Sequence, residues 1–157
     1  MFSPASTAAA ILLVAGIPGA VAADDVITKR SSHAFPTTLE RVEASAKEKG
    51  FMIFARLDHA AAAASVGQAM LPSTVLVIGN PRVGTERFVR FPTLAIDLPL
   101  RVLVWQDQTG AAFVTYNAAR HMLTIAQRHG LPATDVVVTQ AERTEELMTT
   151  IADSAVR

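Results

Sequence analysis

The feature that most constrains the fold is a pair of apolar segments joined by a short polar turn. Residues 100–105 and 111–116 flank Asp107-Gln108-Thr109-Gly110, a combination typical of a β-hairpin, so the two strands should pair antiparallel. Further strands are predicted at 26–30, at 74–78 and at 51–55, an uninterrupted apolar run that should be buried. The pattern predicts an α+β fold, a two-layer α/β sandwich in which helices pack on a small mixed or antiparallel sheet of four to five strands.

Two helices are predicted among the first strands. One opens at Pro36 and stops before Gly50, with Thr37 and Glu40 spaced as in a capping box. The other is the alanine-rich stretch at 60–64. The carboxylate of Asp58, which precedes this stretch, can cap its first turn. Its small side chains should let it pack tightly on the sheet.

Three more helices are predicted toward the C-terminus. They cover about 82–91, the stretch from a capping Asn117 to His129, and about 139–156. The last of them places four apolar residues on one face: Leu147, Met148, Ile151 and Ala152.

Composition sets the size and excludes several classes of function. Half of the 157 residues are apolar, which is enough for one domain and too few for two of ordinary size. The 14 Lys and Arg residues balance the 14 Asp and Glu residues, and no basic tract occurs, so no nucleic-acid partner is expected. The absence of cysteine excludes disulfides, thiolate metal sites and cysteine-based catalysis.

The first 22 residues have the pattern of a secretory leader. They contain no charged side chain, and an apolar stretch is followed by glycine, proline and then small residues, which predicts cleavage after Ala22 or Ala23. We expect 1–22 to be a signal peptide and 23–157 a single domain, periplasmic or secreted. No membrane span is expected once the leader is removed, and the alternative is an uncleaved anchor.

Four blocks of sequence together resemble a known family. They are, in chain order, Phe51-Met52-Ile53-Phe54-Ala55-Arg56-Leu57-Asp58-His59-Ala60-Ala61-Ala62, Gly79-Asn80-Pro81-Arg82-Val83-Gly84-Thr85, Leu98-Pro99-Leu100-Arg101-Val102-Leu103-Val104-Trp105-Gln106-Asp107 and Val114-Thr115-Tyr116-Asn117. This arrangement is similar to that of domain-of-unknown-function family 302, with the core of the resemblance at 51–130. The resemblance implies a small bacterial α/β domain that is often exported, is dimeric and has no established activity. Gln106 stands where such proteins often have an acid, which weakens any role for a carboxylate there.

The segment from Gly79 to Thr85 has the glycine spacing of a phosphate-binding loop and lies between a strand and a helix. Thr85 occupies the position of the phosphate-binding lysine and an acidic residue follows, so a nucleoside triphosphate site is excluded. The favoured interpretation is that both glycines serve turn geometry. A weaker anion site, formed by backbone N–H groups with Arg82 or Arg87, stays open as the alternative.

The four histidines predict no metal centre. None of His33, His59, His121 and His129 has the spacing that places two imidazoles one helical turn apart. We therefore expect no metal and no cofactor, and His121 and His129 are interpreted as surface residues of one helix.

Two hypotheses for function follow from the remaining polar residues. The preferred one is a non-catalytic domain that binds a small ligand or a partner, with Asp58, His59, Asn80, Thr85 and Asp97 as candidate ligand-binding residues. Asp97 lies among leucines and an isoleucine, and it is expected to accept backbone N–H bonds within its loop. The alternative is an acid/base hydrolase or isomerase that uses His59 with Asp58 or Asp97.

The segment 93–98 is apolar and lies between Pro92 and Pro99. A monomer would expose it unless its own helices covered it, and association is the usual remedy. Together with the family resemblance, this segment predicts a homodimer.

Overall fold

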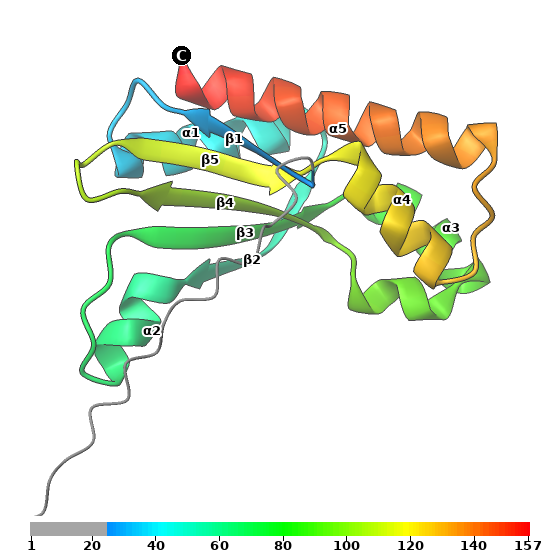
Figure 1. Ribbon diagram of the computed structural model, residues 1–157, viewed down its shortest axis with the longest axis horizontal. Helices are drawn as coiled ribbons and strands as arrows, with labels where there is room; N and C mark the ends of the chain where they lie inside the picture. The colour runs from blue at the N-terminus through cyan, green and yellow to red at the C-terminus, as the bar shows by residue number, and fades with distance from the viewer. Residues whose placement is uncertain (1–24) are drawn as a thin grey trace, which may run out of the picture.

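The computed structural model describes residues 25–157, so the predicted signal peptide lies outside the described residues. One five-stranded sheet, entirely antiparallel, runs through the molecule in the order β1-β5-β4-β3-β2 (Figure 1). The strands are β1 (Val26–Arg30), β2 (Met52–Asp58), β3 (Ser73–Gly79), β4 (Leu100–Gln106) and β5 (Ala112–Asn117). The predicted α+β class is confirmed, and the sheet is the antiparallel one of the two types expected.

The predicted hairpin is the β4–β5 pair. Its turn is closed by the carboxylate of Asp107, which accepts hydrogen bonds from the backbone N–H of Thr109 at 2.8 Å and of Ala111 at 3.0 Å. Gly110 adopts φ +86°, a conformation that glycine takes without a steric penalty. The turn sequence therefore fixes the register of the central strands.

Helices form the second layer. They are α1 (Phe35–Glu48), α2 (His59–Ser65), α3 (Pro81–Arg90), the 3-10 helix η1 (Pro92–Ile96), α4 (Ala119–Arg128) and α5 (Asp135–Val156). Helices α1 and α5 contact each other and the same strands, and α5 extends along the length of the molecule beside β5 and β1 (Figure 1). Between these helices and the sheet lies the core, which includes Leu39, Val42, Leu76, Ile78, Val102, Val104, Val114 and Ile151.

The other face of the sheet is only partly covered. Leu57, Val75, Leu103 and Thr115 lie opposite one another across four strands, and directly paired side chains share a face. Apart from Leu57, which is exposed, they are half-buried. The helices of the second layer therefore bury one face of the sheet far more deeply than the other.

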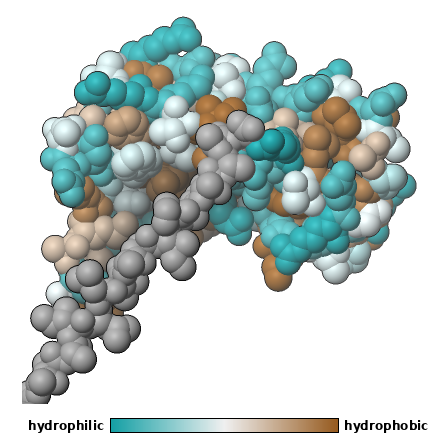
Figure 2. Space-filling model, viewed as in Figure 1, coloured by the Kyte–Doolittle hydropathy of each residue, from teal (hydrophilic) through white to brown (hydrophobic). Residues whose placement is uncertain are grey.

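The predicted burial of the second strand is wrong. Among the strands of residues 25–157, β2 pairs with β3 alone and lies at the edge of the sheet, so Met52, Phe54 and Leu57 are between 47% and 52% exposed. The alanine-rich helix α2 follows it, and none of its residues is buried. The expected tight packing is also wrong, because α2 projects beyond the edge of the sheet, where its alanines appear pale brown in Figure 2.

Two predicted helix caps are wrong as well. α1 begins at Phe35 with Ala34 as its N-cap and no side-chain cap bond, because Pro36 fits the first turn and leaves Thr37 inside the helix. Asn117 does not cap α4, whose N-cap is Ala118. Asn117 belongs to β5 because that strand continues until it has paired with the first residue of β1.

The apolar segment between the two prolines folds back on its own chain. Its first part forms η1, in which Leu94 is buried, whereas Ile96 is 70% exposed. The Leu98–Pro99 peptide bond is cis. Because Leu94 is buried within one chain, only the exposed end of this segment is left to favour association.

Candidate functional site

A cavity of about 360 Å³ lies where β2, α3 and the start of β4 meet. Most of its wall is apolar, formed by Phe51, Phe54, Val83, Phe88, Leu98, Pro99, Leu100, Met122 and Leu147. Its polar side chains are those of Lys49, Asn80, Thr85, Arg87 and Thr144. The cavity thus combines an apolar interior with a small set of polar groups, as ligand pockets do.

Gly79 explains how the wall of the cavity is built. A Cβ atom at this position would lie 3.0 Å from Cε2 of Phe54 and 3.1 Å from Cβ of Pro99. Neither Gly79 nor Gly84 has a positive φ, so the interpretation that both serve turn geometry is wrong. Gly79 is instead needed for a close approach of two side chains, and Gly84 lies inside α3.

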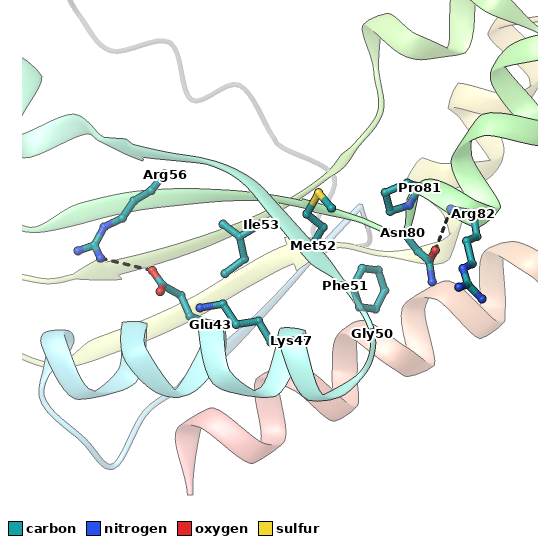
Figure 3. A pocket seen from close by; sticks show the side chains of 10 residues that line it. All are labelled: Glu43, Lys47, Gly50, Phe51, Met52, Ile53, Arg56, Asn80, Pro81 and Arg82. Atoms are coloured by element: carbon teal, nitrogen blue, oxygen red, sulfur yellow. Dashed lines mark hydrogen bonds and ion pairs between the residues drawn. The ribbon is translucent and has the colours of Figure 1, made fainter.

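A second, open hollow adjoins the cavity and shares Phe51, Asn80 and Pro81 with it. It has a volume of about 1020 Å³ and runs between α1 and β2 toward the N-terminus of α3 (Figure 3). We call it the groove. In Figure 3 the ring of Phe51 stands between the end of α1 and the Asn80-Pro81 corner, at the boundary of the two hollows.

The charges around the two hollows are strongly one-sided. Among the described residues that line them, the cations are Lys47, Lys49, Arg56, Arg82 and Arg87, and the only carboxylate is Glu43. Glu43 forms an ion pair with Arg56 at 3.3 Å. A chain with no net charge therefore concentrates positive charge at this place.

The predicted ligand-binding residues divide between two ends of the sheet. Asn80 and Thr85 line the cavity, and Asn80 also caps α3 by accepting the backbone N–H of Arg82 at 3.0 Å. Asp58 and His59 are exposed at the far end of β2, about 20 Å away for a seven-residue strand. The predicted cap is confirmed, since the Asp58 carboxylate accepts the N–H of Ala61 at 2.9 Å.

Asp97 contacts a histidine that the sequence analysis had placed on the surface. Its Oδ2 lies 2.7 Å from Nε2 of His129, whose side chain is only 6% exposed, and 3.3 Å from Nη1 of Arg128. The Nδ1 of His129 lies 2.9 Å from the hydroxyl of Thr93. The expectations that His129 is a surface residue and that Asp97 accepts backbone N–H bonds are replaced by a side-chain cluster.

The cluster has the order hydroxyl, imidazole, carboxylate that nucleophilic catalysis uses. Thr93, Asp97 and His129 line neither the cavity nor the groove. Neither of these two hollows could therefore bring a substrate to the cluster. What it does is tie η1 to the end of α4. Leu98, next to Asp97, forms part of the cavity wall, and the cluster thereby positions that wall.

The Asp97 cluster predicts a specific pH dependence. The hydrogen bond from His129 lowers the pKa of Asp97, opposed by burial and assisted by the charges of Arg128, His129 and Arg101. A carboxyl whose folded pKa is depressed contributes stability above its unfolded pKa and loses it as the pH falls through the folded pKa. The thermal stability difference between wild type and Asp97→Asn should shrink progressively as the pH falls from about 5 toward 3.

Two other carboxyls also have lowered pKa values, Asp107 through a hydrogen bond from Thr109 and Asp153 through one from Lys29. Both are present in the wild type and in Asp97→Asn, so the comparison removes their contribution. Circular dichroism melts from pH 7 to pH 3 measure the difference. A difference that does not change with pH would show that the Asp97 carboxylate is not held by this cluster.

Comparison with known proteins places the chain in a family. The family model described as "Domain of unknown function DUF302" matches residues 27–155. The chain belongs to this family. The resemblance inferred from the four sequence blocks is thereby confirmed, and the DUF302 match extends beyond them to include nearly all of β1 and of α5.

A solved DUF302 structure has the same fold. The crystal structure of a conserved DUF302 protein from Bacillus stearothermophilus superposes with a TM-score of 0.70, at 18% sequence identity, covering 84% of this chain and 98% of that one. At this identity the likeness concerns the fold alone.

Curated relatives of this DUF302 chain carry a functional name. The proteins named fluoride-specific ion channel FluC 1 of Brucella suis biovar 1 and of Brucella abortus biovar 1 are each 36% identical over 116 residues, which is 74% of this chain. The matched part is 44% and 42% of their respective lengths, so the chain spans less than half of the relatives that it matches. Within residues 25–157, no helix is both long and apolar enough to cross a membrane.

Proposed function

We propose that this DUF302 domain binds a small, largely apolar molecule in the cavity between β2, α3 and β4. The observation that carries the proposal is the aromatic-lined space of about 360 Å³, which falls within the range of about 300 to 1,000 Å³ found for ligand sites. Three phenylalanine rings, of Phe51, Phe54 and Phe88, offer contact to a ligand. Asn80 and Thr85 supply hydrogen-bonding groups that can orient it.

A thermal-shift screen of purified protein against metabolites and metals tests the proposal. A ligand at a hundred times its Kd stabilises the folded state by about 2.7 kcal/mol. Compounds that stabilise the wild type should fail to stabilise Gly84→Leu. A Cβ atom added at position 84 would lie 3.4 Å from the Phe88 ring, and the rest of a leucine side chain would occupy the cavity.

Val89→Leu is the matched control, since it adds apolar volume to the exposed side of the same helix. It should respond to ligands as the wild type does. Compounds that stabilise Gly84→Leu as strongly as the wild type would show that the cavity is not the binding site.

We also propose that the domain works outside the cytoplasm after removal of residues 1–22. The support is the uncharged apolar leader that ends in small residues before Asp24. Mass spectrometry of the periplasmic or secreted fraction should find a mature N-terminus at Ala23 or Asp24. Recovery of the chain with Met1 from the membrane fraction would contradict export with cleavage.

A homodimer is the assembly that we propose. Edge strand β2 leaves one side unpaired and exposes Met52, Phe54 and Leu57, and an exposed apolar strand edge is a site for pairing with another chain. A second copy is the favoured partner because the two identical edges can meet in one two-fold contact.

Leu57→Glu is expected to convert the dimer to a monomer, measured by light scattering at micromolar concentration. The matched control is Ile96→Glu, which places the same charge on the exposed end of the segment 93–98. Dissociation by Ile96→Glu alone would move the interface to that segment. A wild-type protein that is monomeric under these conditions would overturn the dimer.

A second candidate function is that of an interaction domain in a fluoride channel system. It is favoured by the 36% identity to part of proteins named as fluoride-specific ion channels. Loss of the protein is then expected to make its source cells more sensitive to fluoride. Unchanged growth in fluoride would contradict this role and leave the cavity proposal standing.

A further inference from the structure

Resting on the cavity proposal, we infer that the ligand is an apolar organic acid in its ionised form, whose carboxylate is bound by Lys49 and Arg87 while its hydrocarbon part fills the phenylalanine-lined interior. Both charged side chains that line the cavity are cations, and no Asp or Glu of residues 25–157 lines it. A neutral apolar ligand would not need them, and a cationic ligand would be repelled.

Lys49 is poised at one side of the cavity. It is the C-cap of α1 and is followed by Gly50, at φ +79°, and by Phe51 in the cavity wall. Its Nζ lies 4.0 Å from Oε1 of Glu48, whose side chain is largely exposed. Such a surface pair is weak, so the Lys49 ammonium group is available to a ligand carboxylate.

Arg87 reaches the same cavity from α3. Its Nη2 donates a hydrogen bond at 3.0 Å to the side-chain oxygen of Gln140 on α5. Gln140 is neutral, so it orients the guanidinium without cancelling its charge. A guanidinium has five N–H donors in a planar fork that suits a carboxylate, and this single bond leaves donors for a ligand.

The surroundings reinforce the same preference. The groove that adjoins the cavity adds Lys47 and Arg82. The one carboxylate among its described lining residues, that of Glu43, is paired with Arg56. Positive potential around the shared boundary therefore attracts an anion to the cavity. This concentration is local, because the whole chain has no net charge.

Three probes with eight carbon atoms each separate charge from hydrophobicity: octanoate, octan-1-ol and octylammonium. Isothermal titration calorimetry at low salt should give octanoate a Kd roughly tenfold lower than that of octan-1-ol, as a charge-assisted hydrogen bond would provide. Octylammonium should bind more weakly than octan-1-ol. Raising the salt concentration should reduce the octanoate preference, because the two cations are partly exposed.

The double variant Lys49→Gln, Arg87→Gln should bring the octanoate and octan-1-ol affinities within about twofold of each other, through a larger loss of affinity for octanoate than for octan-1-ol. Lys47→Gln is the matched control, since Lys47 lines the groove and not the cavity. It should keep most of the octanoate preference and lose only the small long-range contribution of one groove cation. Melting curves confirm that each variant is folded.

The outcomes distinguish this inference from the proposal beneath it. If octan-1-ol or octylammonium binds the wild type as tightly as octanoate and competes with it, the cavity binds ligands but the carboxylate inference is wrong. If the preference persists in the double variant, other groups hold the carboxylate. If none of the three probes binds, both the inference and the cavity proposal are contradicted.

Discussion

Truncation of Ile151 to alanine is expected to lower the free energy of unfolding by about 3 kcal/mol, within the range known for large-to-small changes in cores. Ile151 on α5 is 0% exposed and belongs to the cluster in which α1 and α5 meet the sheet. Loss of its side chain leaves a cavity that the antiparallel sheet cannot collapse to fill. Urea denaturation monitored by circular dichroism measures the change.

Leu147→Ala is the matched control for this prediction. Leu147 lies about one turn before Ile151 on the same helix, but it is 42% exposed and lines the proposed ligand cavity. Its truncation should cost less than about 1 kcal/mol and should instead weaken ligand binding. Equal losses of stability in the two variants would show that α5 does not present these side chains to different surroundings.

The contrast between Leu147 and Ile151 shows what helical periodicity in the sequence can and cannot predict. The pattern correctly placed Met148, Ile151 and Ala152 on one face, and all three are buried. Leu147 belongs to the same apolar stripe, yet it is 42% exposed and lines the cavity. Periodicity predicts which residues share a face, and only the tertiary arrangement decides which neighbour each residue meets.

The strands show the same division between local and long-range information. The hairpin was predictable because its two strands and its turn are adjacent in sequence. The position of β2 was not, because an apolar run such as 51–55 is equally compatible with a central strand and with an edge strand. Its edge position depends on β1 pairing with β5 at the opposite side of the sheet.

The candidate site was predictable only in part for the same reason. Asn80 and Thr85 stood out because they lie in one short glycine-containing segment, although that segment suggested phosphate chemistry. The Asp97–His129 contact joins residues 32 positions apart, and no sequence spacing signals it. The sequence did contain one local signal, because Gly130, with φ +81°, marks the C-terminal end of α4. His129 is the C-cap at this end, where Thr93 and Asp97 contact it.

Substitution of Gly79 by valine is expected to lower the free energy of unfolding by about 2 kcal/mol, a typical cost of overpacking. The Cβ atom alone would come within 3.0 Å of the Phe54 ring and 3.1 Å of Cβ of Pro99, and valine adds two methyl groups beyond it. Phe54 can move because it is at the sheet edge, whereas Cβ of Pro99 is fixed to its backbone ring. Displacement of Phe54 would also change the shape of the cavity and weaken octanoate binding.

Gly84→Ala is the control, because it adds a methyl group on the other side of the same cavity. Its Cβ atom would lie 3.4 Å from the movable Phe88 ring, and alanine is favoured over glycine inside a helix by roughly 0.5–1 kcal/mol. Its stability should equal or exceed that of the wild type. The double variant Gly79→Val, Phe54→Leu should recover part of the lost stability, since the smaller side chain relieves the contact. If Gly79→Val melts like the wild type, or if Phe54→Leu gives no recovery, Gly79 is not the residue that lets Phe54 and Pro99 close the wall of the cavity.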